Sequence, residues 1–559
     1  MPAGSFSVIL HGHLPWVLHH GRWPHGQAWL HEAVAEVWLP LLGVVDALGE
    51  ASVDCPLTLG LTPVLLSQLA DPAFPDRFRS YLAGRRLRAQ ADAVEFAGWG
   101  DQHLVGLAET WDERFAELQR RFDAVNGDLP AAIAQRAAQG RLELMASAAT
   151  HAYLPLLRQD ASCRAHIELG LDTTESILGQ RPKGFWLPEC AFRAGGSWSS
   201  PVLPGERVER LGLDTMLARA GVDWTVIDAP LLGGARCEGV VDQGRFVKTG
   251  WDQPEHDERG WRSPLELHRI SSAGDGEGVV ALSRHPGVSE QVWSARVGYP
   301  GDGRYLEFHK KHGGDGLRYW RVTSARASLG DKARYEPEQV PGVVYSQAQH
   351  FATVVRSVLE QHRDTSGRAG VVVAPFDAEL FGHWWHEGLR WLQDVLLTLA
   401  AEPAVTLRSA SGAVGAHGPD KVVALPEGSW GEGSDHRTWL APDTKWMWEV
   451  IHRSEDRFAQ LREEQAGAGA QVREALIQAG RELLLMQASD WPFAVTRGGA
   501  ADYGFKRFSG HASRFDGLCD LASDLAAGRS PDAVQQATLA EALAADGLFG
   551  ELSLEHWSG

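Results

Sequence analysis

Short apolar runs that end in polar residues recur along the chain, and they restrict its fold more than any other feature. Seven runs have this form: FSVILHGHLP, LTLGLTP, LELMASAATHAYLP, GFWLPE, WTVIDAP, VVALSRHP and VVVAPFDAE. Segments with helical spacing of apolar residues separate several of them, for example residues 31–51. Strands that alternate with helices form parallel sheets buried on both faces, which explains continuous apolar runs. We therefore predict an α/β fold, a (β/α)7 barrel related to the eightfold barrel.

The predicted barrel is divided along the chain. Residues 1–195 form its first part and residues 267–409 its second part. Between them, residues 196–266 are rich in Gly, Pro and charge, and we predict insertions over the active site, interrupted by a barrel strand near 223–230. From 410 to 559 the strand pattern gives way to helical patterns, which predicts a helical C-terminal domain.

Two acidic residues follow predicted strands, where parallel sheets place their functional sites. Glu189 follows Trp-Leu-Pro in GFWLPE, and Asp377 follows Pro and Phe in VVVAPFD. Two carboxyl groups suit glycoside hydrolysis: one attacks the anomeric carbon, the other protonates the leaving oxygen, and a separation of about 5–5.5 Å gives retention. The alternatives are a surface carboxylate for Glu189 and a helix N-cap for Asp377. Glu379 competes for a catalytic role.

Histidines suggest a second chemistry at the same strand ends. His11 and His13 follow the first strand, and His383 and His386 follow Asp377. A His-x-His pair beside carboxylates can bind zinc for metal-assisted hydrolysis. None of these spacings is diagnostic, and neutral histidines also bond sugar hydroxyls. A metal-dependent hydrolase is therefore one alternative.

The composition favours a neutral partner. A formal net charge of -19 argues against nucleic acids and anionic membranes, and there is no apolar run of about 18 residues. Many of the 22 tryptophans lie beside Gly and polar residues, such as Trp23 in GRWPHG, where a flat ring can stack on a sugar. One alternative is that these tryptophans form an aromatic core. Another is that the chain is a non-catalytic glucan-binding protein.

The cysteines indicate the compartment. Five are present, scattered and without CxxC spacing, and the N-terminus lacks a basic region of the kind that begins a signal peptide. We expect a reducing cytoplasm and no thiolate metal site.

Five ordered motifs, HGHLP, GLTP, GFWLPE, APFDAELFGHWWHEG and ASDWPF, resemble those of glycoside hydrolase family 57. QVWSARVGYPGDGRYLEFH, LPEGSWGEGSDHRTWL and LLLMQASDWPF are most similar to its 1,4-α-glucan branching enzymes. The resemblance extends from His11 to about His511. It implies a (β/α)7 barrel with a small inserted domain, a helical C-terminal domain that closes one side of the cleft, and no metal or organic cofactor.

The resemblance also implies roles for single residues. Glu189 would be the nucleophile and Asp377 the general acid and then base, while His11, His13 and His151 would line the subsite of the cleaved sugar. The implied activity is cleavage of an α-1,4-glucan, amylose or glycogen, and transfer to a 6-hydroxyl group. Further substrate-contacting positions would be Arg284, Trp293, Gly301, Trp430, Trp439 and Asp490.

One segment departs from the family's pattern. Branching members carry a mobile loop with a tyrosine at its tip, and the matching insertion, 231–266, contains no tyrosine. Trp251 or Trp261 is a candidate substitute. If neither shields the site, water competes with the acceptor, and the alternative function is an α-amylase-like hydrolase that uses the same two carboxyl groups.

Overall fold

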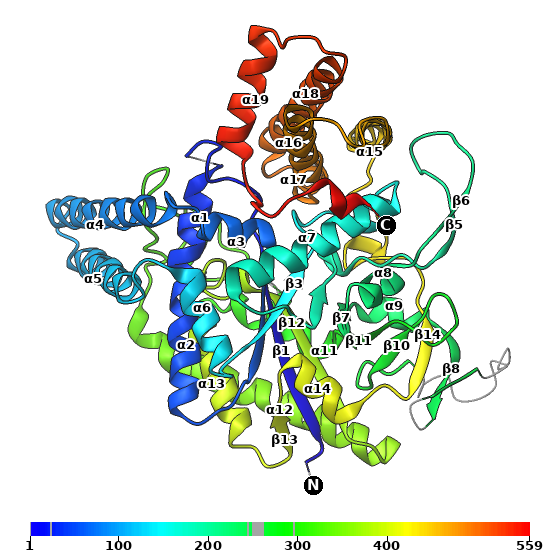
Figure 1. The fold of residues 1–559 in the computed structure, drawn as a ribbon. Coiled ribbons are helices and arrows are strands. Elements are labelled where there is room, and N and C mark those ends of the chain that lie inside the picture. Colours follow the sequence, from blue (N-terminus) through cyan, green and yellow to red (C-terminus); the bar gives the residue numbers. More distant parts are fainter. Residues whose placement is uncertain (1, 23–24, 243–244, 249–261, 295–296, 559) are drawn as a thin grey trace.

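The computed structural model describes residues 2–22, 25–242, 245–248, 262–294 and 297–558. A large sheet, parallel for most of its width, runs through this part of the chain and is surrounded by helices (Figure 1). Within the described ranges, none of the helices has the length and apolar character needed to cross a bilayer.

All seven predicted strands are present, and they lie side by side in parallel. Arg284, just after β11 (Val279–Ser283), forms a parallel bridge to Val373 in β12 (Gly370–Asp377). The His285 N–H also donates a hydrogen bond of 3.1 Å to the Val373 carbonyl. The order across the sheet is β12 (Gly370–Asp377), β1 (Gly4–Gly12), β2 (Leu57–Leu61), β3 (Glu143–Ser147), β4 (Gly184–Trp186), β7 (Trp224–Ile227) and β11 (Val279–Ser283).

Burial explains why these apolar runs form strands. Every residue of β1 is buried, and so is every residue of β12 before Asp377. Both faces of the parallel strands are covered, so alternation with polar residues is absent. The register places His11 of β1 opposite Asp377 of β12, which brings the polar ends of the strands together.

The sheet continues beyond β11 with short strands of mixed direction, and β13 pairs with β1. One of these strands, β14, lies in the part of 410–559 that we predicted to be helical, so the continuous helical part begins only at Lys445. The buried Val422 and Val423 provide its apolar run, which is too short to be recognised by periodicity. These strands are β10 (His268–Ile270), β14 (Lys421–Ala424), β8 (Arg236–Asp242), β9 (Arg245–Lys248), β13 (Val405–Leu407) and the separate hairpin β5 (Gly196–Trp198) and β6 (Val208–Arg210).

Helices pack around the sheet, and α4 and α5 pair as a hairpin that projects from it (Figure 1). Segment 31–51 is helical as predicted, but a π-helical turn, Val34–Trp38, separates α1 from α2. The helices before the C-terminal group are α1 (Gln27–Ala33), α2 (Leu39–Glu50), α3 (Pro63–Leu69), α4 (Phe74–Gly98), α5 (Gln102–Ala124), α6 (Leu129–Ala138), α7 (Asp160–Leu178), α8 (Leu213–Arg219), α9 (Ala229–Gly233), α11 (Pro286–Trp293), α12 (Val340–Ser366), α13 (Gly388–Ala400) and α14 (Ala410–His417).

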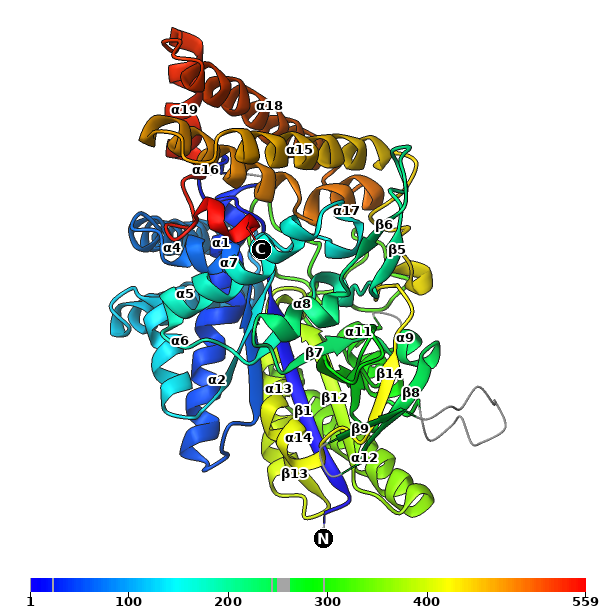
Figure 2. The same ribbon diagram turned by 45° about the vertical axis from the view of Figure 1, so that its right-hand side comes forward.

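A group of C-terminal helices covers the end of the sheet toward which β1 runs, as Figure 2 shows. Helices α16 and α18 pack closely, and α17 lies against α18. This arrangement brings the start of α17 to the strand ends. The helices are α15 (Lys445–Glu464), α16 (Ala470–Met486), α17 (Asp490–Arg497), α18 (Ala501–Ala526) and α19 (Ala533–Asp546).

Candidate active site

A cleft of about 670 Å³ lies at the carboxyl ends of the parallel strands. Residues from several strand ends and from the C-terminal part of the chain line it together. Among the predicted site residues, the lining includes His11, His13, His151, Glu189, Arg284, Trp293, Asp377, Trp430, Trp439 and Asp490.

Glu189 occupies a strained turn directly after β4. Its φ angle is 63°, in the left-handed region that non-glycine residues rarely adopt. The Trp430 indole N–H donates a hydrogen bond of 2.8 Å to Oε2, and the Ser489 hydroxyl donates one of 3.2 Å to Oε1. The Trp430 backbone N–H also donates to the Glu189 carbonyl at 3.0 Å. Both oxygens of this carboxyl group are therefore held in place.

Asp377 has a different environment. It is the last residue of β12 and stands at the N-cap position of the short 3₁₀ turn Ala378–Leu380, but its side chain accepts no capping hydrogen bond, so capping does not account for this carboxyl group. The part of the chain that the structure describes donates no hydrogen bond to its carboxyl group, although the group lines the same cleft as Glu189. Asp377 is thus available to a ligand.

The pKa values of the Glu189 and Asp377 carboxyl groups are both raised into the same range. Burial raises the pKa of both Glu189 and Asp377 to about 7. The Trp430 hydrogen bond opposes this rise for Glu189, whereas the charge of Glu189 raises the pKa of Asp377 further. Hydrogen bonds favour the ionised form of an acid, so the negative charge of the pair belongs on Glu189 and the proton on Asp377. The cleft therefore offers one carboxylate and one carboxylic acid.

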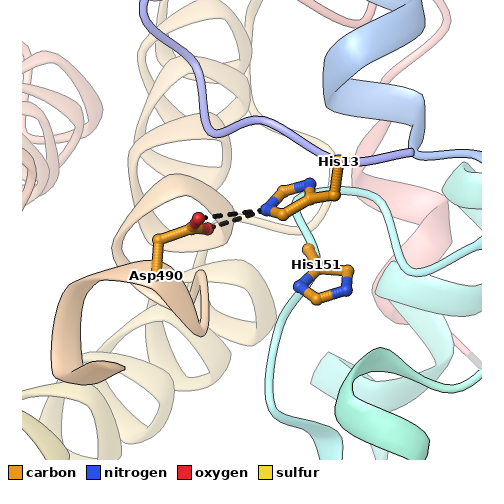
Figure 3. Close-up of side chains that lie close together, drawn as sticks. All are labelled: His13, His151 and Asp490. Carbon is orange, nitrogen blue, oxygen red and sulfur yellow. Dashed lines mark hydrogen bonds and ion pairs between the residues drawn. The ribbon is translucent and has the colours of Figure 1, made fainter. Parts of the chain in front are cut away.

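Three histidines form a stacked group beside Glu189. The rings of His11 and Trp186 are nearly parallel, with centroids 4.5 Å apart, and the rings of His13 and His151 stack at 4.0 Å. His13 Nε2 lies 3.0 Å from an oxygen of Asp490 (Figure 3). The stacking and the ion pair fix the ring orientations before a ligand binds.

A chain of hydrogen bonds leads from this group to Glu189. His11 Nε2 lies 3.0 Å from His151 Nε2, and His151 Nδ1 lies 2.9 Å from the Ser489 hydroxyl. When Glu189 is ionised, the single hydroxyl hydrogen of Ser489 points to it, so His151 donates from Nδ1 and accepts from His11 at Nε2. Burial, together with the neighbouring His13, lowers the pKa of both His11 and His151 well below the usual value. Both rings are therefore neutral in this chain.

His13, His151 and Asp490 also test the metal hypothesis. They place one ligand atom each within 4.8 Å of one another (Figure 3). A metal ion must lie in the plane of each imidazole that binds it. The rings of His13 and His151 stack face to face with 18° between their planes, so their lone pairs run side by side and do not converge on one point. This geometry suits hydrogen bonding to a ligand better than tetrahedral zinc, and the cluster includes neither His383 nor His386.

The other predicted site residues differ in how they reach the cleft. Arg284 lines it and forms two hydrogen bonds of 2.8 Å with Asp228. Trp439 is only 1% exposed and stacks on Tyr153, so most of its surface serves packing. Gly301 is outside the lining, at the end of a short 3₁₀ turn, and Trp23 lies outside the described residues.

Glu379, the competitor of Asp377, has a structural partner. The His13 backbone N–H donates a hydrogen bond of 3.0 Å to its Oε1. Burial, and then the charge of Asp377, raise its pKa well above the usual value. Glu379 is therefore a neutral acid that holds the end of β1 against the cleft.

Ser489 is a site residue that the sequence analysis missed. It lies inside the ASDWPF motif, next to Asp490, so that motif could have indicated it. A serine among small residues carries no signal of its own, and its contact with Glu189 joins residues 300 positions apart.

The described residues of segment 196–266, which was predicted to cover the active site, lie away from the cleft. No described residue between 196 and 266 lines the cleft, and β8 and β9 pair at the edge of the sheet. Trp251 and Trp261 lie outside the described residues. Shielding of the cleft by this segment stays a prediction.

Comparison with known proteins decides the family. Residues 7–311 match the family model described as glycosyl hydrolase family 57, and residues 450–557 match the one described as the C-terminal part of 1,4-α-glucan branching enzymes. The chain belongs to glycosyl hydrolase family 57. The predicted resemblance is confirmed, and this family 57 chain presents its two carboxyl groups where the motifs GFWLPE and APFDAE predicted them.

Relatives extend the match over nearly the whole chain. The 1,4-α-glucan branching enzyme of Thermococcus kodakarensis is 35% identical over 92% of this chain and 73% of its own length. The crystal structure of the family 57 branching enzyme from Pyrococcus horikoshii has a TM-score of 0.88 and 35% identity, covering 100% of this chain and 97% of that one. The structure of an α-amylase from Thermotoga maritima has a TM-score of 0.83 and 26% identity, covering 100% and 99%.

Asp377→Asn is expected to make this family 57 protein more stable at high pH. The folded-state pKa of about 7 exceeds the ordinary value of 3.8 for an aspartate, so the folded state holds an extra proton between these pH values. The free energy of unfolding of the wild type therefore falls as pH rises through this window, and the neutral amide removes that fall. Thermal melts at pH 5, 6, 7 and 8 should show a melting-temperature gain that grows with pH.

The control for this prediction is Asp364→Asn, which removes a carboxyl group that is 75% exposed. It should change the melting temperature by the same small amount at every pH. A gain for Asp377→Asn that does not depend on pH would contradict the assigned environment.

Ser489→Ala is expected to move the acidic limb of the pH–kcat/KM profile upward by about 1–2 pH units. The lost hydrogen bond favours the ionised form of Glu189, and a bond to a charged group contributes about 1.5–3 kcal/mol. Ser489→Thr keeps the hydroxyl and should keep the wild-type limb. A lower kcat with an unmoved limb in Ser489→Ala would contradict the role of this bond.

Proposed function

We propose that this chain is a 1,4-α-glucan branching enzyme. It cuts an α-1,4-glucan with retention, holds one part covalently on Glu189 and transfers that part to a 6-hydroxyl group of another glucan. The observation that carries this proposal is the pair of cleft carboxyl groups, Glu189 with two hydrogen-bond donors and Asp377 with none from the described chain. The branching-enzyme match of residues 450–557 supports transfer as the outcome.

In the first step, Glu189 attacks the anomeric carbon of the glucan. The bond between this carbon and the glycosidic oxygen breaks, and Asp377 gives its proton to the departing oxygen, which becomes the 4-hydroxyl group of the released chain. The fixed rings of His13 and His151, with Asp490, supply polar atoms for the hydroxyl groups of the cleaved sugar. The product is a glycosyl ester on Glu189.

In the second step, the 6-hydroxyl oxygen of an acceptor attacks the same carbon. Asp377, now ionised, takes the hydroxyl proton while the bond to Glu189 breaks, which restores both carboxyl groups. Water in place of the acceptor would give hydrolysis. Trp293 and Trp430, with ring planes 77° apart and centroids 5.8 Å apart, present an apolar wall that excludes water and stacks on glucan.

A second candidate function is hydrolysis at the same two carboxyl groups. The similar structure from Thermotoga maritima is named an α-amylase, and segment 231–266 carries no tyrosine that would shield the intermediate. Both functions share the first step and differ only in what attacks the ester.

The proposed function has consequences for the fold and the setting. We infer that the bridge between Arg284 and Val373 closes the parallel strands into a (β/α)7 barrel, and that residues 445–546 act as a helical C-terminal domain. Amylose and glycogen are the expected substrates, in glycogen synthesis in the cytoplasm, without a cofactor.

Incubation with amylose separates the two functions. Reducing ends are counted before and after treatment with an α-1,6-specific debranching enzyme. Branching predicts a large increase only after debranching, because the anomeric carbon that cleavage releases stays bound to Glu189 and then to the acceptor, and never becomes a reducing end. Many reducing ends beforehand, with no later increase, would establish the hydrolase.

Glu189→Gln is expected to reduce turnover of amylose by several orders of magnitude, because an amide cannot form the glycosyl ester. Binding of maltoheptaose, measured by calorimetry, should remain. Glu432→Gln changes another cleft glutamate, one that is 67% exposed, and should keep turnover. Near wild-type turnover in Glu189→Gln would overturn the nucleophile assignment and would favour a non-catalytic or differently catalysed reaction.

A further inference from the structure

We propose that the acceptor glucan binds to a surface formed by Phe308, His383 and Trp384, on the Asp377 side of the cleft. This proposal rests on the proposed function and names the part of the cleft that receives the attacking chain.

Two large aromatic side chains line the cleft while remaining well exposed. Trp384 is 45% exposed and Phe493 is 42% exposed, and both belong to the cleft lining. Aromatic rings presented to solvent in a cleft bury little surface against the fold, so their value lies in contact with a ligand. The flat apolar faces of a glucan are the ligand that this cleft is proposed to bind.

The elements that carry the two aromatic residues reach the cleft from different sides. Phe493 belongs to α17, whose first residue, Asp490, pairs with His13. Ser489, just before α17, bonds to Glu189. Phe493 therefore belongs to the side that holds the cleaved sugar on the nucleophile.

Trp384 belongs to the side of the general acid. It follows Asp377 in the same strand-end loop, and its backbone N–H donates a hydrogen bond of 3.1 Å to the Glu379 carbonyl. In a retaining mechanism, the general acid faces the oxygen of the departing chain and later the hydroxyl group of the incoming chain. The acceptor must therefore occupy the Trp384 side.

His383 adds a directed polar group to this side. Its Nδ1 lies 2.5 Å from Glu36 Oε2, and Arg318 donates a hydrogen bond of 3.0 Å to its backbone carbonyl. Although burial disfavours the charge on Glu36, Arg318 and the His383 hydrogen bond lower its pKa to about 2. Glu36 is therefore ionised and accepts from Nδ1, which leaves Nε2 to meet a sugar hydroxyl. Phe308 meets the His383 ring edge to face at 5.1 Å and adds apolar surface.

The backbone fixes this surface in advance. Glu36 lies in the π-helical turn Val34–Trp38, and such turns occur frequently at functional sites. Gly382, at a φ of 110°, brings the strand-end loop so close that a Cβ atom would lie 2.0 Å from the Glu36 carbonyl oxygen. Only glycine permits this approach. The loop that carries His383 and Trp384 is thus positioned before an acceptor binds, which lowers the entropic cost of binding.

Trp384→Ala and Phe493→Ala form a matched pair for the test. The donor is α-maltosyl fluoride, whose small leaving group leaves the acceptor side of the cleft empty, and the acceptor is maltohexaose. Transfer products are quantified at increasing acceptor concentration, and their linkage is determined with the α-1,6-specific debranching enzyme. His383→Ala is a second variant that tests the same surface if Trp384→Ala does not fold, as judged by circular dichroism.

The expected result is α-1,6 transfer by the wild type and a half-saturating acceptor concentration about 5- to 10-fold higher in Trp384→Ala. His383→Ala should also raise the half-saturating acceptor concentration. Phe493→Ala should change the donor concentration needed for half-maximal transfer and leave the half-saturating acceptor concentration unchanged. The acceptor site would be overturned, and the branching function left standing, if the wild type gave α-1,6 transfer but the half-saturating acceptor concentration did not rise in Trp384→Ala and His383→Ala. A rise in Phe493→Ala alone would have the same meaning. Hydrolysis or α-1,4 transfer alone by the wild type would overturn the branching function and this proposal with it.

Discussion

The hydrogen bonds from Trp430 and Ser489 to Glu189 connect the two halves of the molecule at its reactive centre. Glu189 follows strand β4, while its two donors lie 241 and 300 residues further along the chain. They fix both carboxyl oxygens in a turn whose left-handed backbone is strained. The C-terminal helices therefore do more than cover the strand ends, because Ser489, just before α17, supplies part of the environment that decides the ionisation of Glu189, the proposed nucleophile.

Burial of the residues that line the cleft has two consequences that support each other. Burial raises the pKa of Glu189 and Asp377 into the same range, and the unequal hydrogen bonding then separates them into a carboxylate and an acid. In the proposed reaction, exclusion of water by Trp293 and Trp430 would also protect the glycosyl ester from hydrolysis. One physical cause thus prepares the first step of the proposed reaction and favours transfer in the second.

The two sides of the cleft are built differently. On the Glu189 side, stacked histidines and Asp490 form a rigid polar group suited to the hydroxyl groups of one sugar. On the Asp377 side, the exposed ring of Trp384 and the His383 ring held by Glu36 present a more open, largely apolar surface. In the proposed reaction, the polar side would hold the covalent sugar and the open aromatic side would receive the acceptor chain, a division that suits a transferase acting on polymers.

The parallel strands, the positions of Glu189 and Asp377 at their ends and the family could be predicted from the amino-acid order, because continuous apolar runs and ordered motifs are local signals. The sequence did not reveal β14, whose apolar run is short, and it could not separate packing from ligand contact for Trp439, which is buried on Tyr153. The Ser489 bond to Glu189, the orientation of His383 by Glu36 and the unequal environments of the two acids appear only in the folded chain. These depend on contacts and burial between residues hundreds of positions apart, and local patterns do not encode them.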